Sequence, residues 1–553
     1  MYSPRSSYLI DSTLEKLEAA IPKIVVKQFP AEPILRIGFM EGYEKIDFRV
    51  SGKFNITDLE GDPIFSGVHS RLKWRSLLEG GHGATFIYSI LVTACREESE
   101  AMAIVEKMRR LYPQVRVQRL GGQLLIAGEM VNDNTKYRVL AGAFETETEA
   151  KKLLLKFGDE YAPRIIREKV KEPHGKLEVY DAEYDYSVKI EDGFRIVPVE
   201  DTTTVTLYGV RVGSGFQWQS QADRAYKGIV EIRVGNDARL CAISEISIDR
   251  YLKGVVPAEM PAGYPQDALM AQAVAARSAV LAKLGTKHLN EPYDFCANVH
   301  CQVYSGISSE AEAANQAVEA TSGEVLYYED HICDAVYSAV CGGHTEHKRN
   351  VWNPPDEPYL QGDYDETGNK VKKMGLDLSK EKDVRKWVEE RPDVFCSLNR
   401  PNLPAIVSYS KKYFRWEVSY SRKELEDIIK KRTGEDIGIL YDIIPLHRGV
   451  SGRLMEIEVL GSRKNIYIKK ELNIRRALSS TYLRSACFVI DVEMGDMGMP
   501  LAFHFRGAGW GHGVGMCQIG AAVMALDKYN YKKILAHYYK ETKIRSVYST
   551  ELP

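Results

Sequence analysis

Apolar and polar residues alternate along much of the N-terminal region, which is the pattern of strands with one buried face. Between residues 31 and 80 this alternation runs through PILRIGFMEG and EKIDFRVSGKFNITDLEGDPIF. Glu60-Gly61 and Asp62-Pro63 mark turns in the second stretch. We expect residues 1–83 to form a small β domain, with a short amphipathic helix ahead of the first strand.

Residues 84–170 combine strand and helix patterns. ATFIYSILVTA predicts a strand, and ESEAMAIVEKMRRLY has apolar residues at helical spacing. VRVQRLGGQLLIAGEM predicts a hairpin about Gly121-Gly122, and YRVLAGAFETETEAKKLLLKF predicts a strand that runs into a second helix. The order β-α-β-β-α-β is typical of a small ferredoxin-like sandwich. We expect residues 171–204 to be a linker.

Strand patterns return at residue 205, in TVTLYGVR and GIVEIRVGNDARLCAISEISI, and they lead into a long helix pattern. Pro265 fits the first turn of that helix, and Asp267 suits the positive end of its dipole. We expect residues 205–553 to form one large domain, with the charged and loosely patterned residues 362–440 as a peripheral insertion. The predicted fold class is α+β, rich in strands and divided into several domains.

Composition and charge narrow the classes of function. The 553 residues exceed the roughly 250–300 that one core supports, and the net charge of −2 lacks the basic excess of a nucleic-acid-binding protein. No segment reaches the roughly 20 apolar residues of a membrane span. The N-terminal stretch MYSPRSSYLIDSTLEKLEAAIPK lacks the apolar core of a signal peptide.

Glu259 is the first candidate for catalysis, within YLKGVVPAEMPAGYP just before the predicted helix. Apolar neighbours raise the pKa of a carboxyl group, as a general acid near neutral pH requires. The N-terminus of the following helix would instead favour the carboxylate. On residue types alone, an exposed glutamate in a turn is the alternative. The apolar neighbours are Val255, Val256, Pro257, Met260 and Pro261.

Cysteine and histidine gather in FCANVHCQVYSG, where Cys296 and Cys301 are close in sequence and His300 adjoins Cys301. This spacing is compatible with zinc ligands. Cys341 and His344, in CGGH, could complete a tetrahedral site if the two loops meet. Buried thiols are the alternative. The isolated cysteines are predicted to be small buried residues, and they are Cys95, Cys241, Cys333, Cys396 and Cys487.

The glycine-rich segment GWGHGVGMCQIGA near the C-terminus permits backbone conformations closed to other residues and lets a ligand approach closely. A phosphate-binding loop would end in GKS or GKT, and this segment has no such ending. We therefore expect no nucleotide ligand.

Six segments in this order resemble the signature of the SpoIID/LytB family of stage II sporulation proteins. They are YLKGVVPAEM, AQAVAARSAVLA, HCQVYSG, CGGHTE, SGR and HGVGMCQIGA. YRVLAGAFETETEA also resembles the second half of SPOR domains, which bind peptide-stripped glycan strands; a generic α+β spacer is the alternative for that unit.

The resemblance implies that residues 205–553 form a peptidoglycan lytic transglycosylase with Glu259 as its catalytic acid. In this mechanism Glu259 protonates the glycosidic oxygen between N-acetylmuramic acid and N-acetylglucosamine. As carboxylate it then accepts the C6 hydroxyl proton while that oxygen attacks C1, which gives a 1,6-anhydro end. Ordinary glycosidases use two carboxyl groups, whereas here the substrate supplies the nucleophile. The implied substrate is glycan without stem peptides, outside the cytoplasm.

The resemblance also implies further site residues and partners. A structural zinc that catalysis does not require is expected on Cys296, His300, Cys301 and Cys341, although the family usually has serine at the last position, so that Cys341 either adds a ligand or forms a disulfide. The alternative function, from the LytB branch, is a non-catalytic enhancer of a cell-wall amidase. No nucleic-acid partner is expected. The residues expected to bind substrate are Gln272, Arg277, Tyr304, Ser338, His344, His512 and Gln518.

Overall fold

The structure is a computed structural model that describes residues 27–69, 71–110, 112, 114–158, 161, 163–212, 220–352, 356–366, 368, 370–398, 403–496 and 498–548. It is α+β, rich in strands and divided into several units, as the sequence predicts. The helix expected ahead of the first strand lies outside the described residues. Within these ranges, the helices are too short or too polar to cross a bilayer.

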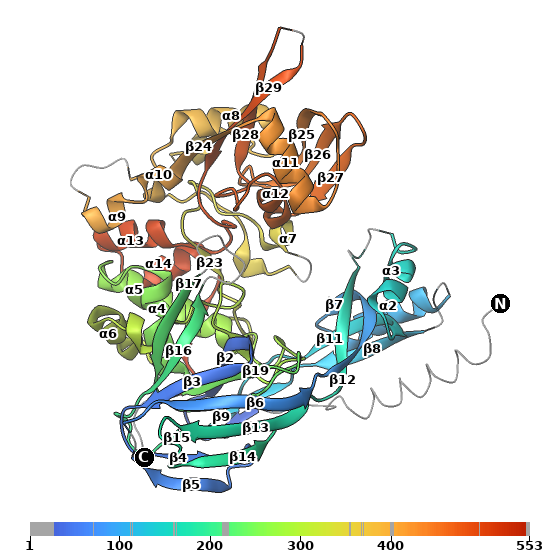
Figure 1. Cartoon of the computed structure of the whole chain (residues 1–553). Helices are drawn as coiled ribbons and strands as arrows, with labels where there is room; N and C mark the ends of the chain where they lie inside the picture. The colour runs from blue at the N-terminus through green and yellow to red at the C-terminus, as the bar shows by residue number, and fades with distance from the viewer. Residues whose placement is uncertain are drawn as a thin grey trace, which may run out of the picture.

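Two large sheets form the base of the molecule (Figure 1). One has the order β20-β2-β19-β18-β15-β4-β5 and the other β14-β13-β6-β3-β16-β17. Strands of the first 83 residues therefore pair with strands between residues 174 and 247 and do not form a separate domain. The strands are β2 (Ile34–Tyr43), β3 (Lys45–Val50), β4 (Phe54–Thr57), β5 (Pro63–Val68), β6 (Trp74–His82), β13 (His174–Asp181), β14 (Ser187–Glu191), β15 (Gly193–Pro198), β16 (Val205–Val212), β17 (Ser220–Tyr226), β18 (Ile229–Val234), β19 (Leu240–Ser247) and β20 (Phe295–Cys296).

The prediction that residues 171–204 are a linker is wrong, because β13, β14 and β15 lie there. Leu177 and Val179 of β13 and Ile196 of β15 are fully buried, so apolar burial at a period of two places these strands inside the sheets. β13 pairs antiparallel with β6, from His174 opposite His82 to Asp181 opposite Trp74. The unit between β6 and β13 is thus inserted into a single β ladder.

The inserted unit has the expected order of elements. Its sheet is β12-β7-β11-β8, and two helices pack on it. The predicted hairpin at Gly121-Gly122 is wrong, since β8 pairs with β11 while β9 leaves this sheet and pairs with β10 and β1. The elements are β1 (Lys27–Phe29), β7 (Thr85–Cys95), α2 (Glu98–Arg109), β8 (Val115–Leu120), β9 (Gln123–Ile126), β10 (Glu129–Asp133), β11 (Lys136–Phe144), α3 (Glu147–Leu154) and β12 (Arg164–Lys171).

A layer of helices lies between the two base sheets and the upper part of the molecule (Figure 1). α5 is buried along nearly its whole length, and it contacts α4, α6, α13 and α14. Alanines such as Ala271 and Ala275 allow this close packing. The elements here are α4 (Ile248–Glu259), α5 (Gln266–Leu281), η2 (Gly306–Ser309), α6 (Glu312–Ala320), β21 (Glu324–Tyr328), β22 (His331–Ile332), β23 (Tyr337–Ser338), β30 (Met516–Cys517), α13 (Gln518–Leu526), α14 (Tyr531–Tyr538) and β31 (Lys543–Ser546).

The upper part has a hydrophobic core of its own, which joins Trp416 and Leu425 to Ile457 and Phe505. The predicted end of the insertion at residue 440 is therefore wrong, because β24 pairs with β29 along its whole length. The elements are α7 (Lys348–Val351), η3 (Pro358–Leu360), η4 (Lys372–Met374), α8 (Glu381–Glu390), η5 (Phe395–Ser397), α9 (Ala405–Ser408), α10 (Lys411–Phe414), β24 (Arg415–Ser421), α11 (Arg422–Thr433), β25 (Leu440–Arg448), β26 (Leu454–Gly461), β27 (Ile466–Lys469), α12 (Glu471–Ala477), β28 (Phe488–Met494) and β29 (Pro500–Ala508).

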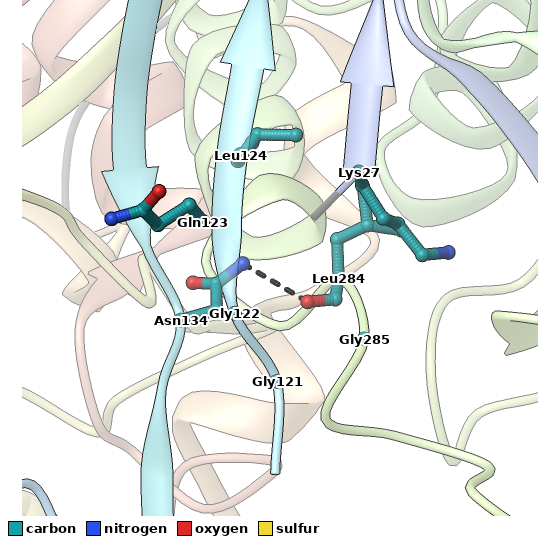
Figure 2. Close-up of a pocket in the computed structure, with 8 residues that line it drawn as sticks. All are labelled: Lys27, Gly121, Gly122, Gln123, Leu124, Asn134, Leu284 and Gly285. Carbon is teal, nitrogen blue, oxygen red and sulfur yellow. Dashed lines mark hydrogen bonds between the residues drawn. The ribbon is translucent and has the colours of Figure 1, made fainter. Parts of the chain in front are cut away.

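Asn134 attaches the inserted unit to the C-terminal end of α5. Its Nδ2 donates to the carbonyl oxygens of Leu281 at 2.8 Å and Leu284 at 3.0 Å, and the second bond is drawn in Figure 2. Gly121 passes so close that an added Cβ would lie 2.2 Å from the carbonyl oxygen of Asn134. Tyr327 adds a bond from its hydroxyl to the carbonyl oxygen of Val131.

We expect Asn134→Ala to lower the free energy of unfolding by about 1–3 kcal/mol, because it leaves two carbonyl groups at the end of α5 without their donor. Chemical denaturation measures the change. Glu129→Ala, at an exposed position on the same hairpin, is the matched control and should have little effect. Equal stability of Asn134→Ala and the unchanged chain would contradict this role.

Candidate functional site

Glu259 is the last residue of α4, which differs from its predicted place in a loop before a helix. The helix continues through Pro257, and the amide of Met260 closes it on the carbonyl of Val256 at 2.9 Å. The negative end of a helix dipole disfavours a carboxylate. The dipole of α4 therefore favours the protonated acid at Glu259. The influence expected from the N-terminus of the following helix stays a prediction.

The carboxyl group of Glu259 is half-buried and has one close hydrogen bond. Its Oε1 accepts from the amide of Val303 at 2.9 Å. Burial raises the pKa of Glu259, and the Val303 amide opposes this by stabilising the carboxylate; no charged group contributes appreciably. A carboxyl group with a raised pKa and a partly open surface can donate a proton near neutral pH.

Gln518 connects the last motif to this acid. Its Nε2 donates to the backbone carbonyl of Glu259 at 3.0 Å and to Oε1 of Gln272 at 3.1 Å. Gln272 has no exposed surface, so the prediction that it binds substrate is wrong. Gln272 orients Gln518, which is 7% exposed and holds the end of α4. Three of the sequence motifs meet at this point.

Two tyrosines that the sequence did not single out lie near the acid. The pKa of Tyr337 is raised by burial and then by the charge of Glu259. Burial is also the main cause that raises the pKa of Tyr251, with contributions from Cys301 and Glu259. Their hydroxyl groups therefore stay protonated and uncharged at neutral pH. Tyrosine is common in this chain, so no sequence signal distinguished these two.

His512 and Ser338 lie beside this group. Nδ1 of His512 accepts from the amide of Val514 at 3.0 Å, and a hydrogen bond joins His512 to the backbone of Tyr337. Burial, with the charges of Arg453 and Arg475, lowers the pKa of His512 to about 3, so its ring is neutral. Ser338 pairs with Cys517 in a two-stranded sheet and is 7% exposed.

Exposed aromatic faces border His512. The ring of Trp352 lies 4.8 Å from that of His512, and Trp510, two residues earlier in the chain, lies 4.2 Å from the ring of Tyr413. Trp352 is 37% exposed and Trp510 is 38% exposed. Large apolar rings that remain open can bind a flat apolar face of a ligand. The sequence analysis missed both tryptophans.

The prediction that Arg277 and Tyr304 bind substrate is wrong, because they are at most 2% exposed. His344 is 7% exposed, as Ser338 and Gln518 are, and its binding of substrate stays a prediction. Arg277 is fully buried, with its guanidinium 2.7 Å from Asp249. Tyr304 is 2% exposed and packs against Tyr251, and His344 bonds the backbone of its neighbour through Nδ1 at 2.6 Å. These residues hold the motif loops together.

A cluster of nitrogen and sulfur donors adjoins the Val303 loop. The ligand atoms of His288, Cys296, His300 and Cys301 all lie within 4.8 Å of one another. Nε2 of His288 is 3.2 Å from Sγ of Cys301, and Nδ1 of His300 is 3.6 Å from the same sulfur. Two thiols and two imidazoles at these separations fit a tetrahedral zinc ion. The thiol of Cys296 lowers the pKa of Cys301 to about 7 by hydrogen bonding.

Cys341 is not part of this donor cluster, so its prediction as a ligand here is wrong. It lies in a second group, with Asp365, Cys396 and Cys517. The fourth donor residue, beside Cys296, His300 and Cys301, is His288. Its signal in the sequence was a histidine eight residues before Cys296, a wider spacing than that of adjacent zinc ligands.

We expect Glu259→Gln to raise the melting temperature at neutral pH. The raised pKa means that the ionised form destabilises the fold, a cost complete above the folded-state pKa and absent below the ordinary value of 4.5. Thermal unfolding should show a gain of about 2 °C for each kcal/mol relieved at pH 7.5 and no gain near pH 4. Glu319→Gln, at an exposed position paired with Lys253, is the control. A loss at neutral pH would contradict the desolvation of Glu259.

Three family models match the chain. A SPOR domain model matches residues 84–165, which confirms the SPOR resemblance and removes the spacer alternative. The SpoIID model, described as stage II sporulation protein, matches residues 236–328, where α4, α5 and the four-donor cluster lie. A domain of unknown function, DUF8618, matches residues 346–515 of the upper part.

Curated relatives agree with these matches. An uncharacterised protein of Brachyspira hyodysenteriae is 30% identical over 310 residues, which are 56% of this chain and 69% of that protein. The amidase enhancer of Bacillus subtilis is 29% identical over 53% of this chain and 40% of its own length. Stage II sporulation protein D of Bacillus subtilis is 25% identical over 55% of this chain and 76% of its own length. The chain therefore belongs to the SpoIID family of stage II sporulation proteins and carries a SPOR domain within it.

Proposed function

We propose that this protein is a lytic transglycosylase that cleaves the glycan strands of peptidoglycan, with Glu259 as its acid. The observation that carries the proposal is the half-buried carboxyl group of Glu259, whose pKa is raised by burial and whose hydrogen bond comes from a backbone amide. Family membership supports a role at the cell wall.

One carboxyl group performs both proton transfers in the proposed reaction. Glu259 gives its proton to the glycosidic oxygen, and the bond from C1 of N-acetylmuramic acid to that oxygen breaks. The C6 hydroxyl oxygen of the same sugar attacks C1, and its proton passes to Glu259, which restores the acid. No water is consumed, and the product is a 1,6-anhydro end. The proposed scheme needs only one carboxyl group, whereas most glycosidases use two.

The neighbouring side chains would hold the sugar chain. The open faces of Trp352 and Trp510 suit the apolar faces of pyranose rings. His512, whose Nδ1 accepts from the amide of Val514, would hold the loop beside the ring of Trp352. The SPOR domain would bind the same polymer and raise its concentration at Glu259. Asn134 would keep the two units at a fixed separation.

The second candidate is a non-catalytic enhancer of a cell-wall amidase. The similarity to the amidase enhancer of Bacillus subtilis supports it. In that function the chain would bind glycan strands and an amidase, and Glu259 would have no chemical role.

Digestion of purified, peptide-stripped glycan strands distinguishes the two candidates. We expect the unchanged chain to release products with 1,6-anhydro-N-acetylmuramic ends, read by mass spectrometry. Glu259→Gln should lower the rate by about 100-fold or more, as loss of a general acid does. Its amide oxygen can still accept from Val303, so folding is preserved. Glu319→Gln should digest at the unchanged rate.

Strand binding is measured on the same variants by co-sedimentation. Binding without anhydro products from any variant would sink the transglycosylase and favour the enhancer. Equal digestion by Glu259→Gln and the unchanged chain would show that another group is the acid.

We also propose that the four-donor cluster of His288, Cys296, His300 and Cys301 holds a structural zinc ion. When bound, zinc would fix the loop that carries the Val303 amide, which donates to Glu259. This chain's own acid needs no metal for the reaction above.

Metal analysis of the purified chain tests this site. Cys301→Ser should remove one zinc ion per chain and lower the melting temperature, while Cys333→Ser, a buried thiol outside the cluster, should keep the metal. Unchanged zinc content in Cys301→Ser would contradict the assignment.

A further inference from the structure

A second group of metal-binding side chains lies in the core, where the upper part meets the helical layer. Cys341, Asp365, Cys396 and Cys517 are each at most 2% exposed. Their ligand atoms all lie within 4.8 Å of one another. Sγ of Cys341 is 3.5 Å from Sγ of Cys396 and 3.4 Å from Oδ2 of Asp365.

Backbone amides point at two of these sulfur atoms. The amides of Cys341 and Gly520 donate to Sγ of Cys517 at 3.2 and 3.4 Å, and the amide of Gly343 donates to Sγ of Cys341 at 3.4 Å. Hydrogen bonds to a charged group favour that charged form, so these amides stabilise thiolates. A metal-bound cysteine is a thiolate.

The carboxylate of Asp365 is oriented by residues outside the group. Its Oδ1 accepts from the hydroxyl of Tyr538 at 2.8 Å and lies 3.7 Å from Nε2 of His537. Its Oδ2 accepts from the amide of Cys396 at 3.1 Å and faces the thiol of Cys341. One oxygen is thus held by outer partners while the other faces the sulfur atoms, as second-shell contacts orient a metal ligand.

The charge balance of this core favours a bound cation. Asp365 is fully buried, and its carboxylate lies among the sulfur atoms of Cys341, Cys396 and Cys517. The buried guanidinium of Arg415 is committed to backbone carbonyl oxygens, among them that of Gly342 at 3.0 Å. Burying negative groups is costly unless a cation is paired with them.

We propose that Cys341, Cys396, Cys517 and Oδ2 of Asp365 form a second metal site, for a single tetrahedral zinc ion. Zinc–sulfur bonds of about 2.3 Å place the sulfur atoms of a tetrahedral site about 3.8 Å apart. The separation of 3.5 Å between Sγ of Cys341 and Sγ of Cys396 is close to this spacing. Thiolate-rich sets favour zinc over magnesium or calcium. Two of the ligands, Asp365 and Cys396, belong to the region that DUF8618 matches, and the other two lie just outside it.

The position of this second zinc site links the upper part to the acid. Cys517 immediately precedes Gln518, whose Nε2 holds the carbonyl of Glu259. A zinc ion here would fix the start of α13 and, through it, the end of α4. This gives the upper part a role in positioning Glu259 without any contact with the reacting atoms.

Native mass spectrometry of the full chain, purified under reducing conditions with zinc supplied, counts the bound ions. We expect two zinc ions per unchanged chain and one in Cys301→Ser, in which the four-donor cluster is broken and the second site remains. Cys396→Ser should also hold one ion, and the double variant none. Cys333→Ser is the matched control and should hold two.

The Cys301→Ser count decides the proposal even if Cys396→Ser does not fold. One retained ion in Cys301→Ser supports the second site, and none overturns it. Two ions in Cys396→Ser would also overturn it, as would a Cys341–Cys396 disulfide found by peptide mapping of the native chain. These outcomes are independent of glycan cleavage, so failure of the proposed enzyme function would not be confused with failure of the metal site.

Discussion

The structure depends on how the end of α4 is held, because Glu259 lies there in a position that costs free energy. Burial and the helix C-terminus both oppose its charge, while the amide of Val303 and the side chain of Gln518 fix the carboxyl group and its backbone carbonyl. The stabilising contacts come from segments more than forty and more than two hundred residues away. Glu259 is thus kept in place by contacts from distant parts of the chain, and packing elsewhere in the fold offsets the stability lost at this point.

Buried contacts around α5 contribute much of the stability that offsets this cost. Arg277 is fully buried, and its guanidinium group has partners: it forms an ion pair with Asp249 and donates to the carbonyl oxygen of Glu324. Small residues on α5 let four helices approach it closely. Residues of the family motifs thus divide into the partly exposed Glu259 and several buried residues that support its position. A family signature records both kinds equally, and only burial separates them.

The sequence predicted helices and strands better than it predicted which strands pair with each other. Alternation identified strands before residue 80 and after residue 205, but the sequence analysis missed β13, β14 and β15, which lie in the predicted linker. The order β-α-β-β-α-β identified the inserted unit. It could not show that β6 resumes its ladder with β13 after some ninety residues, because pairing across an insertion leaves no periodicity in the chain. The site shows the same limit. The motif alone singled out Glu259. That His288, and not Cys341, belongs to the four-donor cluster depends on which loops meet in space. Burial excluded Arg277 from the surface, and residue type alone could not show this.

The insertion point of the SPOR domain constrains how the molecule can handle a long polymer. The inserted unit begins after β6 and ends before β13, and these two strands pair with each other, with His82 opposite His174. Two backbone connections therefore attach the unit, in place of one flexible linker. Asn134 and Tyr327 add further attachments, and Asn134 bonds the end of α5, the helix that packs against α4. Together these attachments restrict rotation far more than a single tether does. If the SPOR domain binds a glycan strand, that strand can reach Glu259 only in a restricted set of orientations. The effective concentration of the strand at Glu259 is then set by the fixed geometry of the two units and not by the length of a linker.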